Sequence, residues 1–273
     1  MISRNKFDKE TLIQVLEEIS MSFKQEITGY LIGGLAMIYH DTKLVTKDID
    51  LVFENDGQAK AFRDNMLQLG YEEVNLVSEE YERLKTFTII EKPDGFRFDV
   101  FIRSVCDGLI LSEEIKKRAE DIKLPGNFKL LMVSVEDIFL FKSITSREDD
   151  LDDMELLSRT RLDWDIIRKE LSNQPNQWRW YTIFHQNLVA LEEDHLVSSP
   201  LREEFEEKAE VSIAMGLVIT KLENQSLTKE ELLRSIDEED PSFSNKVIDA
   251  LIEQDLIVEK DGVFNIKTTT PQE

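Results

Sequence analysis

The sequence predicts an α+β domain with a mixed sheet, followed by a mainly helical domain. Apolar runs of strand length alternate with helical apolar stripes as far as about residue 172. After the polar segment 172–177 the pattern is helical, and it ends in a short hairpin signal. We therefore expect one domain over residues 1–174 and a second, winged-helix-like domain over residues 175–273.

The first part of the chain carries three helical patterns and two buried strands. Apolar residues at helical spacing predict the helices, and unbroken apolar runs predict the strands. The expected elements are a helix at 7–23, a strand at 30–34, a helical continuation at 35–39, a strand at 49–54 and a helix at 58–69. The first strand ends on the pair Gly33-Gly34.

A β-hairpin is expected next. Lys92-Pro93-Asp94-Gly95 has strong turn chemistry and separates β-rich runs at 84–91 and 96–103. Ser112, Ser134 and Asp163 each precede a helical pattern as N-caps do. The elements that follow are a short helix after Ser112, a strand at 128–133, and helices at 135–144, 149–159 and 164–172.

The C-terminal part predicts helices at 203–222, 228–236 and 243–254, then a hairpin around Lys260-Asp261-Gly262. From residue 176 onward it carries 9 Lys and Arg against 21 Asp and Glu, a net charge of −12. A helix that reads DNA needs basic surroundings. We therefore expect this domain to dock a protein or to dimerise.

The charge of the whole chain limits the partners further. The 273 residues contain 33 Lys and Arg against 56 Asp and Glu, a net charge of −23. This field repels phosphate backbones and anionic membranes, so duplex DNA and a membrane are not expected partners. The N-terminus lacks the apolar stretch of a signal peptide. With the single cysteine Cys106, these features predict a cytoplasmic protein.

Three acids interrupt apolar strands. Asp48 and Asp50 are two residues apart, so a strand projects both carboxylates to one face. Asp99 lies between Phe98 and Val100 in the expected hairpin. Like charges at close range raise the free energy of ionisation, and hard divalent ions such as Mg²⁺ suit paired carboxylates. The three acids therefore predict a metal site on one sheet face.

The pair Gly33-Gly34 fits the same chemistry. Glycines at a strand-to-helix turn let the backbone approach a phosphate, and the N–H groups of the helix point toward the anion. Metal ions that bridge phosphate oxygens act in phosphoryl and nucleotidyl transfer. The same glycines also fit a tight turn that serves helix packing alone.

These motifs resemble the signature of the polymerase-β nucleotidyltransferase superfamily, including its minimal and toxin-type members. That signature is a glycine pair at a helix start, an Asp-x-Asp strand and a third acid on a later strand. The matching residues are Gly33-Gly34, Asp48-Ile49-Asp50, Phe98-Asp99-Val100, and a downstream segment from Lys142 through Arg147 to Asp153. The likeness covers roughly residues 28–170.

The resemblance implies a nucleotidyltransferase fold and a role for each motif. Asp48 and Asp50 would hold the metals, and Asp99 would complete one metal site and help to deprotonate the acceptor hydroxyl. Gly33, Gly34 and Lys142 would bind the triphosphate, assisted by Arg147 or Lys47. Two alternatives stay open: Lys142 is a snorkelling surface lysine, and Arg147 forms a helix-start ion-pair cluster with Asp150 and Asp153.

The implied activity is the transfer of a nucleoside monophosphate from an NTP such as ATP to a hydroxyl acceptor, with Mg²⁺ or Mn²⁺. The acceptor would be a small molecule, a protein side chain or a tRNA end. Two alternatives belong to other classes. One is a non-catalytic fold used for binding, for example half of a toxin–antitoxin complex. The other is a winged-helix regulator, which the acidity disfavours.

Overall fold

The computed structural model describes residues 6–74, 86–93, 95–106, 108–236 and 240–267. The chain forms two compact units. Unit 1 contains residues 1–175 and 193–197, and unit 2 contains residues 176–192 and 198–273. Helix α9 (Trp178–His195) contributes residues to both units.

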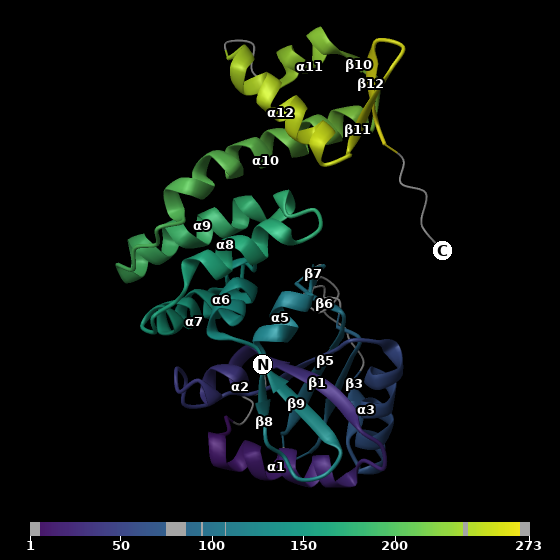
Figure 1. Ribbon diagram of the computed structural model, residues 1–273, viewed down its shortest axis with the longest axis vertical. Coiled ribbons are helices and arrows are strands. Elements are labelled where there is room, and N and C mark those ends of the chain that lie inside the picture. The colour runs from purple at the N-terminus through teal and green to yellow at the C-terminus, as the bar shows by residue number, and fades with distance from the viewer. Residues whose placement is uncertain (1–5, 75–85, 94, 107, 237–239, 268–273) are drawn as a thin grey trace. The chain divides into compact units, whose positions relative to one another are not determined.

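Unit 1 is built on a mixed seven-stranded sheet in the order β3-β4-β5-β2-β1-β9-β8 (Figure 1). The pairs β1–β9 and β2–β5 are parallel, and the other neighbours are antiparallel. The strands are β1 (Ile27–Ile32), β2 (Ile49–Phe53), β3 (Glu72–Val74), β4 (Thr88–Glu91), β5 (Arg97–Ile102), β8 (Glu120–Ile122) and β9 (Phe128–Met132). A separate ribbon pairs β6 (Ser104–Val105) with β7 (Leu109–Ile110). The predicted α+β class with a mixed sheet is confirmed.

Three helices of unit 1 begin at the caps that the sequence predicts. The side chains of Ser112, Ser134 and Asp163 each accept a hydrogen bond from a backbone N–H in the first turn of the next helix. The helices are α1 (Lys9–Ser22), α2 (Gly33–Tyr39), α3 (Asp56–Gln68), α5 (Glu113–Arg118), α6 (Val135–Ser143), α7 (Glu148–Ser158) and α8 (Trp164–Asn173).

The hairpin of β4 and β5 pairs as the turn chemistry predicts, with the N–H of Lys92 donating to the carbonyl of Phe96. Within the described residues its first strand begins at Thr88 instead of residue 84. Residues 84, 85 and 94 of the prediction lie outside the described part of the chain.

An aromatic core fixes which residues of the sheet face the site. Phe62 of α3 packs against Phe53 of β2 and Phe98 of β5, with ring centroids 5.2 and 5.6 Å apart. Successive side chains of a strand point to opposite faces. Burial of Phe98 under α3 therefore directs its neighbour Asp99 to the other face of the sheet.

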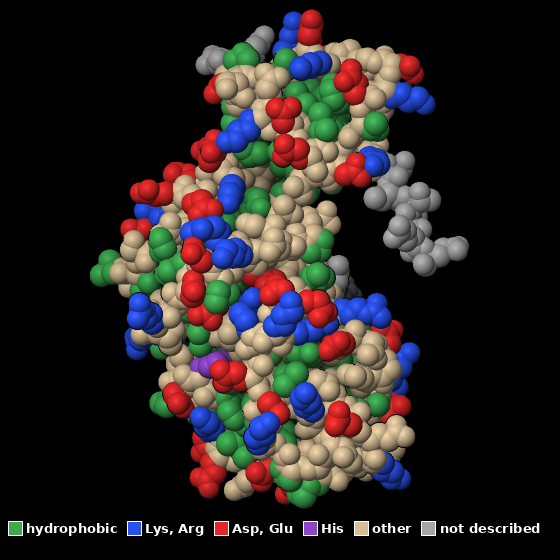
Figure 2. Space-filling model, viewed as in Figure 1, with side chains coloured by type: hydrophobic (Ala, Val, Ile, Leu, Met, Phe, Trp, Pro, Cys, Tyr) green, Lys and Arg blue, Asp and Glu red, His purple; other side chains and the backbone are tan. Residues whose placement is uncertain are grey.

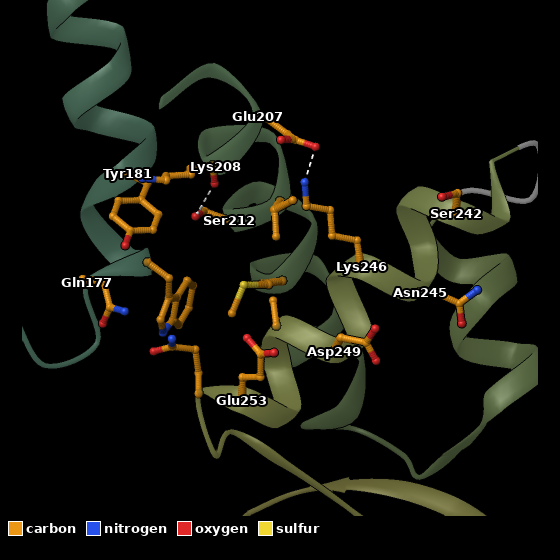
Figure 3. Close-up of a pocket in the computed structure, with 15 residues that line it drawn as sticks. Gln177, Tyr181, Glu207, Lys208, Ser212, Ser242, Asn245, Lys246, Asp249 and Glu253 are labelled. Atoms are coloured by element: carbon orange, nitrogen blue, oxygen red, sulfur yellow. Dashed lines mark hydrogen bonds and ion pairs between the residues drawn. The ribbon is translucent and has the colours of Figure 1, made fainter. Parts of the chain in front are cut away.

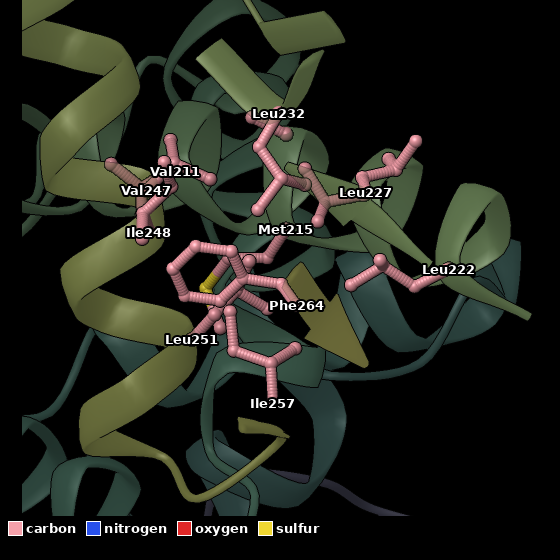
Figure 4. Close-up of a cluster of buried hydrophobic side chains, with 12 residues drawn as sticks. Val211, Met215, Leu222, Leu227, Leu232, Val247, Ile248, Leu251, Ile257 and Phe264 are labelled. Atoms are coloured by element: carbon pink, nitrogen blue, oxygen red, sulfur yellow. The ribbon is translucent and has the colours of Figure 1, made fainter. Parts of the chain in front are cut away.

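Unit 2 is mainly helical and has its own apolar core (Figure 4). Phe264 lies there among side chains such as Met215, Leu232 and Leu251. After α9 the elements are α10 (Arg202–Leu222), β10 (Leu227–Thr228), α11 (Lys229–Ile236), α12 (Pro241–Glu253), β11 (Ile257–Lys260) and β12 (Val263–Ile266). The strands form an antiparallel sheet in the order β10-β12-β11. Across both units, none of the helices in the described ranges has the length and apolar character of a membrane span.

Candidate active site

The parallel pair β2–β5 brings the predicted acids together. Asp50 and Asp99 are register partners on these neighbouring strands, so their side chains share one sheet face. Asp48 precedes β2 and joins them through a buried guanidinium. The Nε of Arg97 lies 2.5 Å from Oδ1 of Asp99 and 3.7 Å from Oδ1 of Asp48.

Arg97 is the site residue that the sequence interpretation missed. Its Nη2 also donates to Oδ2 of Asp99 at 3.1 Å, so both oxygens of that carboxylate accept hydrogen bonds from one guanidinium. The Arg97 side chain is only 3% exposed. The available signal was its spacing, because a residue two positions before Asp99 on a strand points to the same face.

Asp50 differs from the other two acids in its surroundings. Burial and the neighbouring charges of Asp99 and Asp48 raise the pKa of Asp50 to about 7, although the charges of Lys142 and Arg147 oppose the rise. Within the described residues the Asp50 carboxylate makes no hydrogen bond or ion pair. Asp50 is therefore the carboxyl group whose negative charge is least compensated.

The glycine pair is required by contact as well as by backbone geometry. Gly33 has a φ of +66°, and a Cβ there would lie 2.0 Å from Oδ2 of Asp50. A Cβ on Gly34 would lie 2.4 Å from Oγ1 of Thr46. Gly33 thus lets the start of α2 pack directly against Asp50 of β2, and Gly34 lets it pack against the segment that precedes β2.

Lys142 and Arg147 belong to an ion-pair network of α6 and α7. Nζ of Lys142 lies 2.7 Å from Oδ1 of Asp150 and 2.9 Å from Oδ2 of Asp153. Nε of Arg147 lies 2.8 Å from Oδ2 of Asp150. The Lys142 side chain is 12% exposed, so the surface-lysine alternative is wrong, whereas the Arg147 side chain is 42% exposed. The predicted ion pair of Arg147 with Asp150 is present, whereas Asp153 pairs with Lys142.

The donor set fits a divalent ion in part. Asp48 and Asp50 offer hard oxygens, and the raised pKa of Asp50 marks excess negative charge that a cation would relieve. Asp99, however, already has both oxygens hydrogen-bonded by Arg97. In the described ranges no group of three or more His, Cys, Asp or Glu side chains is arranged to hold a metal ion. The pair Asp48 and Asp50 is therefore the fitting part of the predicted ligand set.

Of the other predicted site residues, Lys47 is exposed next to Asp48. Cys106 is half-buried. Burial raises the pKa of its thiol, and the nearby charge of Asp50 adds to the rise, whereas the charges of Arg147 and Lys142 oppose it.

Unit 2 holds a cavity of about 670 Å³ between α9, α10 and α12 (Figure 3). Trp178, Val211 and Met215 contribute apolar lining, and Asp249 and Glu253 contribute carboxylates from α12. Lys246 of α12 is ion-paired to Glu207 of α10 (Figure 3). Figure 2 shows acidic side chains interspersed with basic ones over the face in view. This cavity has neither the paired strand acids nor the glycine turn of the site in unit 1.

The mixed sheet carries a glycine turn and acids on adjacent strands, which are the features on which the resemblance to nucleotidyltransferases was drawn. Residues 10–187 match the family described as "Nucleotidyltransferase of unknown function (DUF6036)". The match covers more than half of the chain, so the chain belongs to this family, and the resemblance drawn from the sequence is confirmed. Comparison with curated proteins gives no match. The family supports a general role in nucleotidyl transfer.

Proposed function

We propose that the protein is a divalent-cation-dependent nucleotidyltransferase that moves a nucleoside monophosphate from an NTP to a hydroxyl acceptor. The observation that carries the proposal is the placement of Asp50 and Asp99 in register on parallel strands, with Asp48 joined to them through Arg97. Acids on one sheet face are costly unless a cation offsets their repulsion.

In this proposal Asp48 and Asp50 hold Mg²⁺ or Mn²⁺. The bound ion would stabilise negative charge on the transferring phosphoryl group. Gly33 leaves room for Asp50 beside the start of α2. Asp99 lies next to this pair, and the role implied for it by resemblance is to accept the proton of the acceptor hydroxyl.

Lys142 and Arg147 supply positive potential at the carboxylate of Asp50, since the charge of each lowers the pKa of Asp50. Lys142 is held by Asp150 and Asp153, so it contributes as a fixed charge. The Arg147 side chain is more exposed. We propose Arg147 as the cation that contacts the triphosphate, since guanidinium groups bind phosphate oxygens in a bidentate manner.

For unit 2 we propose a winged-helix-like domain that docks protein. Its order of α10, β10, α11, α12 and a β11–β12 hairpin supports this reading. Helix α12 stands in the place of a recognition helix, yet its single cation, Lys246, is paired with Glu207 and its Asp249 and Glu253 are exposed. Binding of duplex DNA by the full chain at physiological salt, no weaker than that of a known winged-helix DNA binder, would contradict this proposal.

The experiment for the catalytic proposal uses the four α-³²P-labelled NTPs with cell extract and with Mg²⁺ or Mn²⁺. We expect metal-dependent labelling of one class of acceptor by the wild-type protein and none by Asp48→Asn or Asp50→Asn. The matched control is Asp64→Asn on α3, an exposed acid paired with Arg63. Labelling that survives Asp50→Asn would refute the assigned site. Metal-dependent NTP binding without any labelling would favour the non-catalytic alternative.

A further inference from the structure

We propose that Arg97 is a positioning residue that competes with the divalent ion for Asp99. Because of this competition, the protein binds the ion tightly only when the nucleotide is also bound. This inference rests on the proposed function. In this inference the positive charge of Arg97 sets how strongly the binding of the metal depends on the binding of the nucleotide.

The contacts of Arg97 are those of a fixed counter-cation. Its two donor nitrogens meet the two oxygens of Asp99 at 2.5 and 3.1 Å, in the side-by-side geometry that makes arginine–carboxylate pairs strong. The side chains of Arg97 and Asp99 are 3% and 9% exposed, so water screens this pair poorly. An arginine stays charged in proteins, so this cation cannot leave by losing its proton.

Arg97 also reaches the metal-binding pair. Its Nε lies 3.7 Å from Oδ1 of Asp48, which is itself 28% exposed. A divalent ion held by Asp48 and Asp50 therefore meets a like charge close by. The same guanidinium takes one lone pair on each oxygen of Asp99 and places its positive charge where Asp99 would join the ion. Both effects weaken metal binding to the protein alone.

A nucleoside triphosphate changes this balance. Its phosphate oxygens supply the further hard ligands that Mg²⁺ prefers, and its negative charges offset the repulsion from Arg97. Metal and nucleotide then bind cooperatively. By linkage, each raises the affinity of the other by the same factor.

The test measures Mn²⁺ binding to the full chain by the electron paramagnetic resonance of free Mn²⁺, without nucleotide and with α,β-methylene-ATP, after correction for Mn²⁺ bound to the free nucleotide. We expect Arg97→Gln to bind Mn²⁺ about 10-fold more tightly than wild type without nucleotide, within the usual range of coupling between sites. With the analogue the difference should shrink. The matched control, Arg63→Gln, removes an arginine that pairs with Asp64 on α3 and should leave both affinities unchanged.

Arg97→Gln affinity equal to or below that of wild type would overturn the inference. A second measurement covers a variant that does not fold. In wild-type protein, the ¹⁵N signal of the Arg97 Nε–H should shift on addition of Mg²⁺ with the analogue and stay in place with Mg²⁺ alone. A signal that never shifts, or that shifts fully with Mg²⁺ alone, also overturns it.

The same Mn²⁺ measurements distinguish failure of the proposed function from failure of the role of Arg97. If Asp50→Asn binds Mn²⁺ as tightly as wild type, the metal site itself is misassigned. If Asp50→Asn loses Mn²⁺ while Arg97→Gln binds it as wild type does, only the role of Arg97 is wrong.

Discussion

Unit 1 contains two carboxylate clusters that differ in how completely their side chains are paired. In the cluster of α5, α6 and α8, Arg118 donates to Asp137 at 2.5 and 3.2 Å and to Glu170 at 2.8 Å. The hydroxyl of Ser134 donates to Asp137, and the amide of Gln174 donates to Glu170. Every carboxylate of this cluster therefore has a donor, and the cluster ties three helices together.

The cluster on β2 and β5 is incomplete by comparison. Arg97 satisfies Asp99 and approaches Asp48, but Asp50 has no such partner in the described part of the chain. Burial of a charge without a partner costs free energy that a protein built only for stability would avoid. The fully paired cluster has the character of a structural tie, whereas the incomplete one is where we propose that an external cation binds.

The largest expected effect is a loss of enzymatic activity that occurs when the β2–β5 cluster is changed but not when the Arg118 cluster is changed. Asp50→Asn should reduce nucleotidyl transfer at least 100-fold, about the loss when one electrostatic group of an active site is removed. It should leave the protein as stable or slightly more stable, because carboxylate repulsion is relieved. Asp137→Asn should do the reverse. Initial rates and urea unfolding of both variants check this, and an unfolded Asp50→Asn protein would make Asp50 structural.

The next effect concerns stability. Arg118→Met should lower the free energy of unfolding by about 3–5 kcal/mol, because Asp137 and Glu170 would be left buried without their cation. Arg63→Met, which breaks a more exposed pair, should cost less than about 1 kcal/mol. Urea denaturation measures both. Equal losses would mean that burial does not distinguish the two pairs.

A smaller effect is expected at Gly33. Gly33→Ala should destabilise the protein by about 1–3 kcal/mol through backbone strain, and the new methyl should also displace the Asp50 carboxylate. Gly70→Ala is the matched control, since Gly70 also has a positive φ, +81°, but no atom lies within 4 Å of its added Cβ. Both variants should lose stability, and only Gly33→Ala should lose metal affinity and activity.

The last expected effect is a slope in the pH dependence of stability. Asp50 has a pKa of about 7 in the folded protein against an ordinary 3.8, so between these values the unfolded chain binds fewer protons. The free energy of unfolding contributed by this group therefore falls as pH rises from about 4 to 7. Asp50→Asn should lack that fall. Denaturation at pH 5 and pH 7.5 in both proteins tests it, and identical slopes would contradict the raised pKa.

Local signals in the sequence predicted most elements, because caps and turns act over a few residues. Ser112, Ser134 and Asp163 show this for the helices, and Lys92 to Gly95 for the hairpin. Elements whose position depends on contacts between distant parts of the chain were harder to predict. The edge strand β8 carries no strong apolar run, and α9, which belongs to both units, was predicted only as part of a general helical pattern.

The candidate site was predictable where spacing alone decides direction. Alternation along a strand placed Asp48 and Asp50 on one face, and the register of β2 with β5 adds Asp99. Arg97 obeys the same rule but was missed, because an arginine at a strand start is usually a surface residue. The network of Lys142 with Asp150 and Asp153 depends on how α6 packs on α7, which no local pattern reveals.

Cys106 gives this protein a reporter of its own. Burial raises the pKa of its thiol to about 12, so hardly any thiolate exists at neutral pH. It is the single cysteine of the chain, and it ends the β6 side of the small ribbon beside the charges of Arg147 and Asp50. Alkylation of Cys106 in the native protein should therefore be slow. The rate of thiol capture consequently reports any change that exposes Cys106 or moves the charges around it, with no label introduced into the chain.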